Sequence, residues 1–150
     1  MTTGFNLIEI LVVLAIALTA ALYPAHIAMS TYRQLAIRAD VELTRAVLVH
    51  AHTRALQQQC ESMRCPARQV AQVSSTGVDL LLDTGSRNKQ SASDHFPYLG
   101  HHTVSGDREM VFTAEGRQAT TTTHIQDIYG NWTITVTGTG LISSERIDNR

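Results

Sequence analysis

The chain has 150 residues, which is the size of one domain. Its 12 basic and 13 acidic side chains leave a formal net charge of −1, whereas dedicated nucleic-acid binders and polybasic membrane-surface proteins carry a basic excess. Lys89 is the only lysine, so lysine chemistry would depend on one residue in a polar loop. The sequence has no G-x-S-x-G, P-loop or H-E-x-x-H motif, and we predict neither an enzymatic activity nor a cofactor.

An uncharged run near the start of the chain predicts a transmembrane helix. No Asp, Glu, Lys or Arg occurs from Ile10 to Tyr32, a stretch of 23 residues, and about 20 mostly apolar residues cross a bilayer as a helix. The residues before the run hold no basic side chain, and no small-residue cleavage motif follows it, so it differs from a secretory signal peptide. We therefore expect this helix to stay attached to the chain.

Glu9 does not fit a simple membrane anchor. It lies between Ile8 and Ile10, and a carboxylate at bilayer depth costs about 2.5–3.5 kcal/mol on insertion scales, so it normally has a partner. Two interpretations follow. Either Glu9 sits near the interface and reaches water, or it neutralises a positive group on another chain.

The residues around Glu9 form a motif. Gly4 is followed directly by Phe5, Glu9 stands four residues after Phe5, and the long apolar run follows. This pattern resembles the cleavage and assembly motif of type IV pilins and of the pseudopilins of type II secretion. The resemblance implies a leader at residues 1–4, cleavage between Gly4 and Phe5 by a prepilin peptidase, and methylation of the new amino terminus at Phe5. It also implies that Glu9 acts in filament assembly.

The same resemblance implies a location and partners. Residues 5–32 would be the transmembrane and filament-core helix, anchored in the bacterial inner membrane, and residues 33–150 would form the periplasmic domain. Other subunits and the assembly platform would be the partners. In a filament, Glu9 of one subunit would neutralise the amino terminus of its neighbour inside an apolar helix bundle. The leader lacks the usual basic residue, and Arg33 and Arg38 flank the other end of the run, which is the reverse of the positive-inside pattern.

One helix is expected to continue beyond the membrane, from about Asn6 to Gln59. No glycine occurs between Gly4 and Gly77. Such a helix would be about 80 Å long at 1.5 Å per residue, so its second half must pack on the domain. Pro24 removes a backbone hydrogen bond and is expected to kink the helix or to loosen it locally.

Apolar residues three and four positions apart predict which face of the second half packs on the domain. That face consists of Ile37, Val41, Thr44, Leu48, Ala51 and Ala55. A neighbouring polar face consists of Arg38, Glu42, Arg45 and His52. We predict that the first face packs on the domain.

After the helix, the pattern changes to short β-strands. Val70–Val73 and Val78–Leu82 predict a hairpin around the turn Ser74–Gly77. Further strands are expected at Met110–Phe112, Thr120–Ile125 and Trp132–Thr137 and from Leu141 onward, with 83–93 a polar loop and 95–106 irregular. A long helix followed by about six strands predicts an α+β fold, in which the helix packs on a small antiparallel β domain.

The C-terminal part resembles one branch of the pilin family. Val111-Phe112 precedes Gly116-Arg117, and a later strand pair ends in Ile134–Gly140. This order is similar to that of the GspH/FimT branch, the minor pilins and minor pseudopilins found in or near the filament tip. The resemblance implies a tip-associated minor subunit.

Some members of that branch bind DNA through a Gly-Arg-x-Arg motif in the C-terminal hairpin. Here the hairpin reads Gly140-Leu141-Ile142-Ser143, and Gly116-Arg117 carries only half of the motif. Arg146 and Arg150 remain as candidates for phosphate contacts. The incomplete motif and the net charge make DNA binding a weakly supported alternative.

Cys60 and Cys65 are the only cysteines. In an oxidising periplasm, a disulfide between them would close a short loop at the end of the helix. Free buried thiols are the alternative. A zinc site with His50 and His52 is disfavoured, because side chains two positions apart point to different faces of a helix.

Two further groups of residues contain side chains that can bind metals. His101 and His102 are adjacent, and adjacent residues rarely bind one metal, so we expect solvated loop histidines. Asp94, Asp107 and Glu109 surround the same loop but lack an EF-hand spacing. We therefore predict no metal site.

Together these features predict a minor pilin-like subunit of a type IV pilus, acting in filament initiation or at the tip, in motility, adhesion or DNA uptake. A minor pseudopilin of type II secretion is the first alternative, and a DNA-binding minor pilin is the second. A plain single-pass anchored domain is the remaining possibility. It predicts no cleavage after Gly4 and tolerance of Glu9→Ala.

Overall fold

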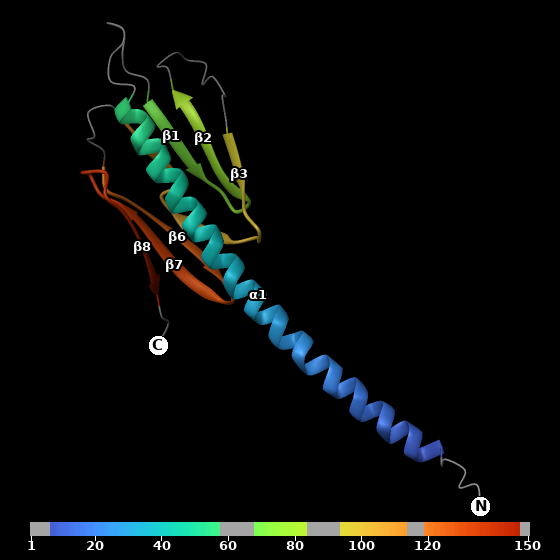
Figure 1. The fold of residues 1–150 in the computed structure, drawn as a ribbon. Coiled ribbons are helices and arrows are strands. Elements are labelled where there is room, and N and C mark those ends of the chain that lie inside the picture. Colours follow the sequence, from blue (N-terminus) through green and yellow to red (C-terminus); the bar gives the residue numbers. More distant parts are fainter. Residues whose placement is uncertain (1–6, 58–67, 84–93, 114–118, 148–150) are drawn as a thin grey trace, which may run out of the picture.

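A computed structural model of the chain describes residues 7–57, 68–83, 94–113 and 119–147. Over these ranges the fold is one helix followed by strands, as Figure 1 shows. The elements are α1 (Leu7–Gln57), β1 (Arg68–Val73), β2 (Gly77–Asp83), β3 (Asp94–Pro97), β4 (Thr103–Gly106), β5 (Glu109–Phe112), β6 (Thr121–Asp127), β7 (Gly130–Val136) and β8 (Ile142–Ile147). The strands form two antiparallel sheets, in the orders β3-β2-β1-β5 and β4-β6-β7-β8. The expected α+β fold with a long helix on a small β domain is confirmed.

The helix α1 has 51 residues and is about 75 Å long at 1.5 Å per residue. It continues through Pro24 as one element. Both sheets lie beside its C-terminal half, while its N-terminal half projects away from the domain (Figure 1). The domain therefore covers the C-terminal half of the helix and leaves the N-terminal half uncovered.

The predicted apolar face of α1 is buried. Ile37, Val41, Thr44, Leu48, Ala51 and Ala55 are all at most 2% exposed. The face packs on β1, β2 and β5 of the first sheet and on β7 and β8 of the second. The helix thus bridges the two sheets, and its periodicity alone was enough to predict this face.

The hairpin predicted after the helix is confirmed. β1 pairs with β2 in the register that places Val73 opposite Val78. In the turn, the backbone N–H of Ser74 donates to the carbonyl oxygen of Gly77 at 2.8 Å, and its hydroxyl donates to the same oxygen at 2.9 Å. These bonds fix the register of the strands that face α1.

The strands expected at 110–112, 120–125 and 132–137 are also confirmed, as β5, β6 and β7. The turn between β7 and β8 contains Gly140 in a left-handed conformation, with φ of +81°. A Cβ at this position would collide with the imidazole of His52 on α1. Only glycine meets both conditions easily, so this turn can lie directly on the helix.

The expectation of irregular structure at 95–106 was wrong, because this stretch contains β3 and β4. Each strand has only four residues and lies at the edge of a sheet, β3 on β2 and β4 on β6. Each segment combines strand-favouring residues with residues that are depleted in strands, namely Asp and Pro in DHFP and Gly in TVSG. The neighbouring strand supplies the order, which no local pattern could reveal.

The core lies between the two sheets and α1. Its largest fully buried side chains are Phe112, Ile37, Leu48, Met110, Ile125 and Ile134. Both sheets contribute alternate residues to it, and the helix contributes its single apolar face. One continuous core therefore holds the helix and the two sheets together.

Leu48 and Leu56 offer a matched test of this packing, because both lie on α1 and they are 0% and 40% exposed. We expect Leu48→Ala to lower the free energy of unfolding by about 2–5 kcal/mol, through lost burial and a cavity. Leu56→Ala should change it by about 0.5 kcal/mol or less. Urea unfolding of the full chain in detergent measures both, and equal effects would contradict this account of the core.

Candidate functional site

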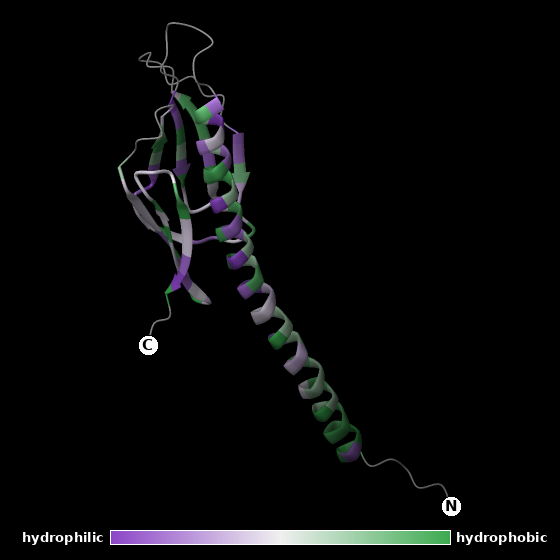
Figure 2. Cartoon of the chain, turned by 60° about the vertical axis from the view of Figure 1, so that its left-hand side comes forward, coloured by the Kyte–Doolittle hydropathy of each residue, from purple (hydrophilic) through white to green (hydrophobic). Residues whose placement is uncertain are grey.

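The N-terminal half of α1 is apolar and uncovered. Its exposed large apolar residues are Leu7, Ile8, Ile10, Leu11, Val12, Val13, Leu14, Ile16, Leu18, Leu22, Tyr23, Ile27, Met29, Tyr32 and Leu35. They occupy all sides of the helix, and Figure 2 shows hydrophobic colouring along the projecting part. A helix that is apolar all round requires an apolar environment on every side.

The energetic cost of leaving this surface in water is large. Burying one large aliphatic side chain contributes about 1.5–3 kcal/mol, so covering this half-helix contributes on the order of 20 kcal/mol. By length and composition, α1 can cross a membrane. The coarser part of the sequence prediction, an N-terminal helix able to span a bilayer, is therefore confirmed.

Three hydroxyl side chains within this half, those of Thr19, Ser30 and Thr31, donate hydrogen bonds inside the helix. The Thr19 hydroxyl donates to the carbonyl oxygens of Ala15 at 3.1 Å and Ile16 at 2.9 Å. The hydroxyls of Ser30 and Thr31 both donate to the carbonyl oxygen of Ile27, at 2.9 and 3.0 Å. These groups consequently need no water, which suits the helix to a lipid or helix-bundle environment.

Glu9 lies in the first turn of α1, where a carboxylate faces the positive end of the helix dipole. The side chains of its neighbours Ile8 and Ile10 are 66% and 53% exposed. Glu9 is thus the one carboxylate at the tip of the apolar half within the described part of the helix. Gly4 and Phe5, the predicted cleavage and methylation residues, lie outside the described residues.

Asp40 links the helix to the domain at the point where the buried half of α1 begins. Its side chain is 1% exposed and accepts three hydrogen bonds. The donors are the backbone N–H of Leu99 at 2.8 Å, the N–H of Gly100 at 3.1 Å, and Nε2 of His102 at 2.7 Å. Because a carboxylate only accepts, the Nε2 atom must carry the proton. The residues 98–102 between β3 and β4 are thereby fastened to α1.

Tyr98 and Thr44 extend this network by one turn of helix. The Thr44 hydroxyl lies 2.8 Å from the carbonyl oxygen of Asp40, to which it donates, and 2.7 Å from the Tyr98 hydroxyl. Since Thr44 has one hydroxyl proton, Tyr98 donates to Thr44. Burial, with a further contribution from the charge of Asp40, raises the pKa of Tyr98 to about 12. The neutral phenol is the form that fits this site.

The expectation of solvated loop histidines was right for His101 and wrong for His102. His101 is exposed, whereas the His102 side chain is 1% exposed. Within the described part of the chain its Nδ1 atom has no hydrogen-bond partner, and it lies 3.9 Å from Oδ2 of Asp127. Sequence reasoning missed Asp40 as well. The available signal was its position, since Asp40 falls between Ile37 and Thr44 on the apolar face, where a carboxylate requires a buried partner.

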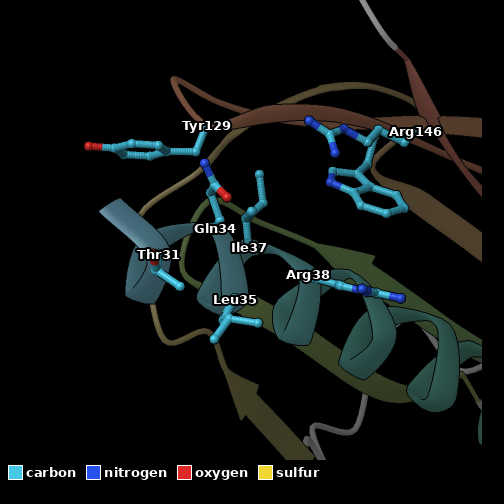
Figure 3. A pocket seen from close by; sticks show the side chains of 8 residues that line it. Thr31, Gln34, Leu35, Ile37, Arg38, Tyr129 and Arg146 are labelled. Atoms are coloured by element: carbon cyan, nitrogen blue, oxygen red, sulfur yellow. The ribbon is translucent and has the colours of Figure 1, made fainter. Parts of the chain in front are cut away.

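A cleft of about 390 Å³ lies beside the start of the buried half of α1. Its lining residues are Thr31, Gln34, Leu35, Ile37 and Arg38 from α1, Tyr129 from the β6–β7 turn, Trp132 from β7 and Arg146 from β8. Figure 3 shows the helix residues on one side and Tyr129 and Arg146 on the other. Of the residues considered for DNA contacts, only Arg146 lines this cleft; Gly116, Arg117 and Arg150 lie outside the described residues.

The residues named as candidates for a disulfide or a zinc site do not come together within the described part of the chain. Cys60 and Cys65 lie outside the described residues. His52 packs on Phe112, with ring centroids 5.8 Å apart, and His50 is exposed. Within the described ranges, no group of three or more His, Cys, Asp or Glu side chains is arranged to hold a metal ion.

Two of the three acidic residues near the 95–106 stretch, Asp94 and Asp107, make contacts within the domain or with α1. Asp94 lies 3.8 Å from the guanidinium of Arg54. Asp107 accepts a hydrogen bond from the backbone N–H of Thr122 at 3.0 Å, and its carbonyl oxygen accepts one from the Thr123 hydroxyl. These contacts explain the two carboxylates as parts of the fold.

No family model, curated protein or solved structure matches the chain. The case for a function therefore depends on the chain's own residues. These are the Gly4-Phe5 step with Glu9, and the uncovered apolar helix that follows them.

Asp40 and Asp79 allow a matched test of the network, because each carboxylate lies 2.7 Å from a histidine nitrogen. The Asp40 pair is buried, whereas the Asp79 and His95 side chains are 31% and 49% exposed. We expect Asp40→Asn to lower the free energy of unfolding by about 3–5 kcal/mol, because it disrupts a buried hydrogen-bonded pair. Asp79→Asn should cost about 1 kcal/mol or less. Urea unfolding gives both values; similar losses would show that Asp40 does not hold the loop to α1.

Tyr98 predicts a loss of stability at high pH. Its pKa is about 12 in the folded chain and about 10 when unfolded, so the unfolded state releases the proton first. Stability from this residue is intact below about pH 10 and falls by about 2 kcal/mol as the pH approaches 12. Urea unfolding between pH 9 and 11 should show this fall, with a smaller slope in Tyr98→Phe. The exposed Tyr32→Phe is the control and should retain the full slope.

Proposed function

We propose that this chain is a minor pilin-like subunit, cut after Gly4 by a prepilin peptidase, methylated on Phe5 and assembled into a type IV pilus. Residues 5–32 anchor it in the bacterial inner membrane until extraction, and residues 33–150 form the periplasmic domain. The observation that carries the proposal is the apolar half of α1, which is exposed on every side and carries Glu9 in its first turn. A helix of this kind serves equally as a membrane anchor and as a strand of an apolar bundle.

The shape of the subunit supports this function. The domain covers only the C-terminal half of α1 (Figure 1). Copies of such a subunit can bring their N-terminal halves together while their domains remain outside the bundle. The driving force is the burial of the same apolar surface that lipid covers before assembly, so extraction exchanges one apolar environment for another.

Glu9 would set the position of each subunit in that bundle. Cleavage after Gly4 creates a positive amino terminus at Phe5, about one helical turn from Glu9. Buried without a partner, either charge is costly, whereas a pair between neighbouring subunits satisfies both. The pair would act mainly on axial register, because only one relative displacement of two helices brings the charges together.

A minor pseudopilin of type II secretion is the alternative function, since the motif and the exposed helix serve that filament equally well. A DNA-receptor pilin is a weaker alternative. Its support is limited to Arg146, because the Gly-Arg-x-Arg motif is incomplete. A salt-dependent shift of a DNA duplex by the full chain in detergent would favour it.

Intact mass and N-terminal sequencing of the membrane-extracted chain test the proposal. We expect a chain that begins at methylated Phe5 in cells with prepilin peptidase and at the original start in cells without it. Gly4→Leu is a matched variant that should remain uncut in both strains. A wild-type chain still starting at Met1 or Thr2 in the presence of the peptidase would contradict the proposal and favour a plain anchored domain.

Mechanical shearing separates the two filament functions. We expect the processed chain to appear in the sheared extracellular fraction, and we expect Glu9→Ala to be processed but retained in the membrane, because only assembly needs the carboxylate. Retention of the processed wild-type chain, together with a secretion defect on deletion, would favour the pseudopilin instead. Normal assembly of Glu9→Ala would remove the register role of Glu9.

A further inference from the structure

The cleft beside α1 lies at a defined height relative to a membrane. The uncharged run ends at Tyr32, and the helix residues of the cleft begin at Thr31 and end at Arg38. If the run occupies the hydrocarbon core, the next turns of α1 lie at the level of the lipid headgroups. The cleft therefore opens where phosphate groups of the bilayer are concentrated.

The chemistry of the cleft suits a phosphate. Its charged lining within the described residues consists of two arginines, Arg38 on α1 and Arg146 on β8, both of which are exposed. The planar guanidinium group donates paired hydrogen bonds to phosphate oxygens. Gln34 adds an amide, and Trp132 adds an indole ring of the kind enriched at membrane interfaces. Among the described residues, the lining includes no carboxylate.

The third arginine of this region shapes the cleft. The Arg33 guanidinium donates to the Tyr129 hydroxyl at 3.4 Å and lies 5.8 Å from the centre of the same ring. This contact holds the β6–β7 turn against α1, so Tyr129 forms one wall. Asp127, the last residue of β6, lines two other depressions that share Tyr129 with the cleft, and it is not among the lining residues of the cleft itself.

Apolar residues beside the cleft extend the surface toward lipid. Ile128 at the tip of the β6–β7 turn is 82% exposed, and Ile147 on β8 is 43% exposed. They line a neighbouring depression that shares Tyr129 and Arg146 with the cleft. Exposed isoleucines next to paired arginines match a ligand that has both an anionic head and an apolar body.

We propose that this cleft binds the phosphate headgroup of an anionic phospholipid of the surrounding membrane, with Arg38 and Arg146 as its ligands. The inference rests on the membrane-anchored state in the proposed function and does not depend on filament assembly. Lipid binding would also explain why basic residues follow the uncharged run at its C-terminal end. Arg33 positions the β6–β7 turn, while Arg38 and Arg146 hold lipid on the domain side of the bilayer.

Trp132 is the only tryptophan of the chain and lies in the cleft, so its fluorescence reports on occupancy. The full chain in an uncharged detergent is titrated with dihexanoyl phosphatidylglycerol and, separately, with dihexanoyl phosphatidylcholine. We expect phosphatidylglycerol to change the emission at a concentration about tenfold lower, since it keeps the charged hydrogen bonds without a competing cation. Equal responses to the two lipids would overturn the proposal.

Matched variants test the two ligands. Arg38→Gln with Arg146→Gln should remove the preference for phosphatidylglycerol. Arg45→Gln with Arg54→Gln removes the same charge from exposed positions of α1 outside the cleft and should retain the preference. The single variant Arg38→Gln, with an unchanged unfolding midpoint, guards against a folding defect. A preference that survives in the first pair, or is lost in the second, would contradict the assignment of the ligands.

Two further titrations separate the sources of phosphate. Inorganic phosphate and a short DNA duplex, each added without lipid, should leave the Trp132 emission unchanged at the concentrations where phosphatidylglycerol saturates. A response to either one that depends on Arg38 and Arg146 would replace the lipid with that ligand. The outcome is separable from the pilin proposal, because a chain that is not cut after Gly4 can still show the lipid preference, and a cut chain can lack it.

Discussion

The buried contact of Asp40 with the loop at 98–102 determines where the domain ends on its helix. Three donors converge on this carboxylate, and the loop that supplies them joins β3 of one sheet to β4 of the other. The apolar packing of the domain on α1 is less directional, and the contacts of Arg33 with Tyr129 and of Arg54 with Asp94 are exposed. With the Asp40 contact, the boundary between the covered and the uncovered half of the helix is set within about one turn.

That boundary gives the two halves of α1 different roles. The covered half is part of a core shared with both sheets. The uncovered half carries an apolar surface that water cannot solvate without a large cost, and the hydroxyl groups of Thr19, Ser30 and Thr31 are satisfied inside the helix. Because the helix is continuous through Pro24, a single helix connects Glu9 to the domain.

Much of the fold could be predicted from the sequence because the local spacing of apolar residues indicates it. The buried face from Ile37 to Ala55, the β1–β2 hairpin and the strands β5 to β7 all follow spacing rules. β3 and β4 could not be predicted, since four-residue edge strands are ordered by their neighbours and not by their own residues. The same limit applies to His102, whose burial depends on a carboxylate 62 positions away.

One part of the candidate site could be predicted from the sequence, and the other part could not. The motif of Gly4, Phe5 and Glu9 is visible in sequence, because its residues are close together and each has a distinct chemical role. The cleft is not visible, since Arg38 and Arg146 are far apart in the chain and only the packing of α1 against β7 and β8 brings them together. The role suggested by Arg146 in sequence, contact with phosphate, stays a prediction.

The central claim is that the uncovered half of α1 is buried against the same half of other subunits. A photoreactive benzoylphenylalanine in place of Leu11, which is 57% exposed, tests it in intact cells. The account predicts adducts between the N-terminal helices of two pilin-like subunits, formed only when the prepilin peptidase is present. The account would be contradicted if illumination gave the same adducts with and without the peptidase. It would also be contradicted if no adduct to another subunit formed.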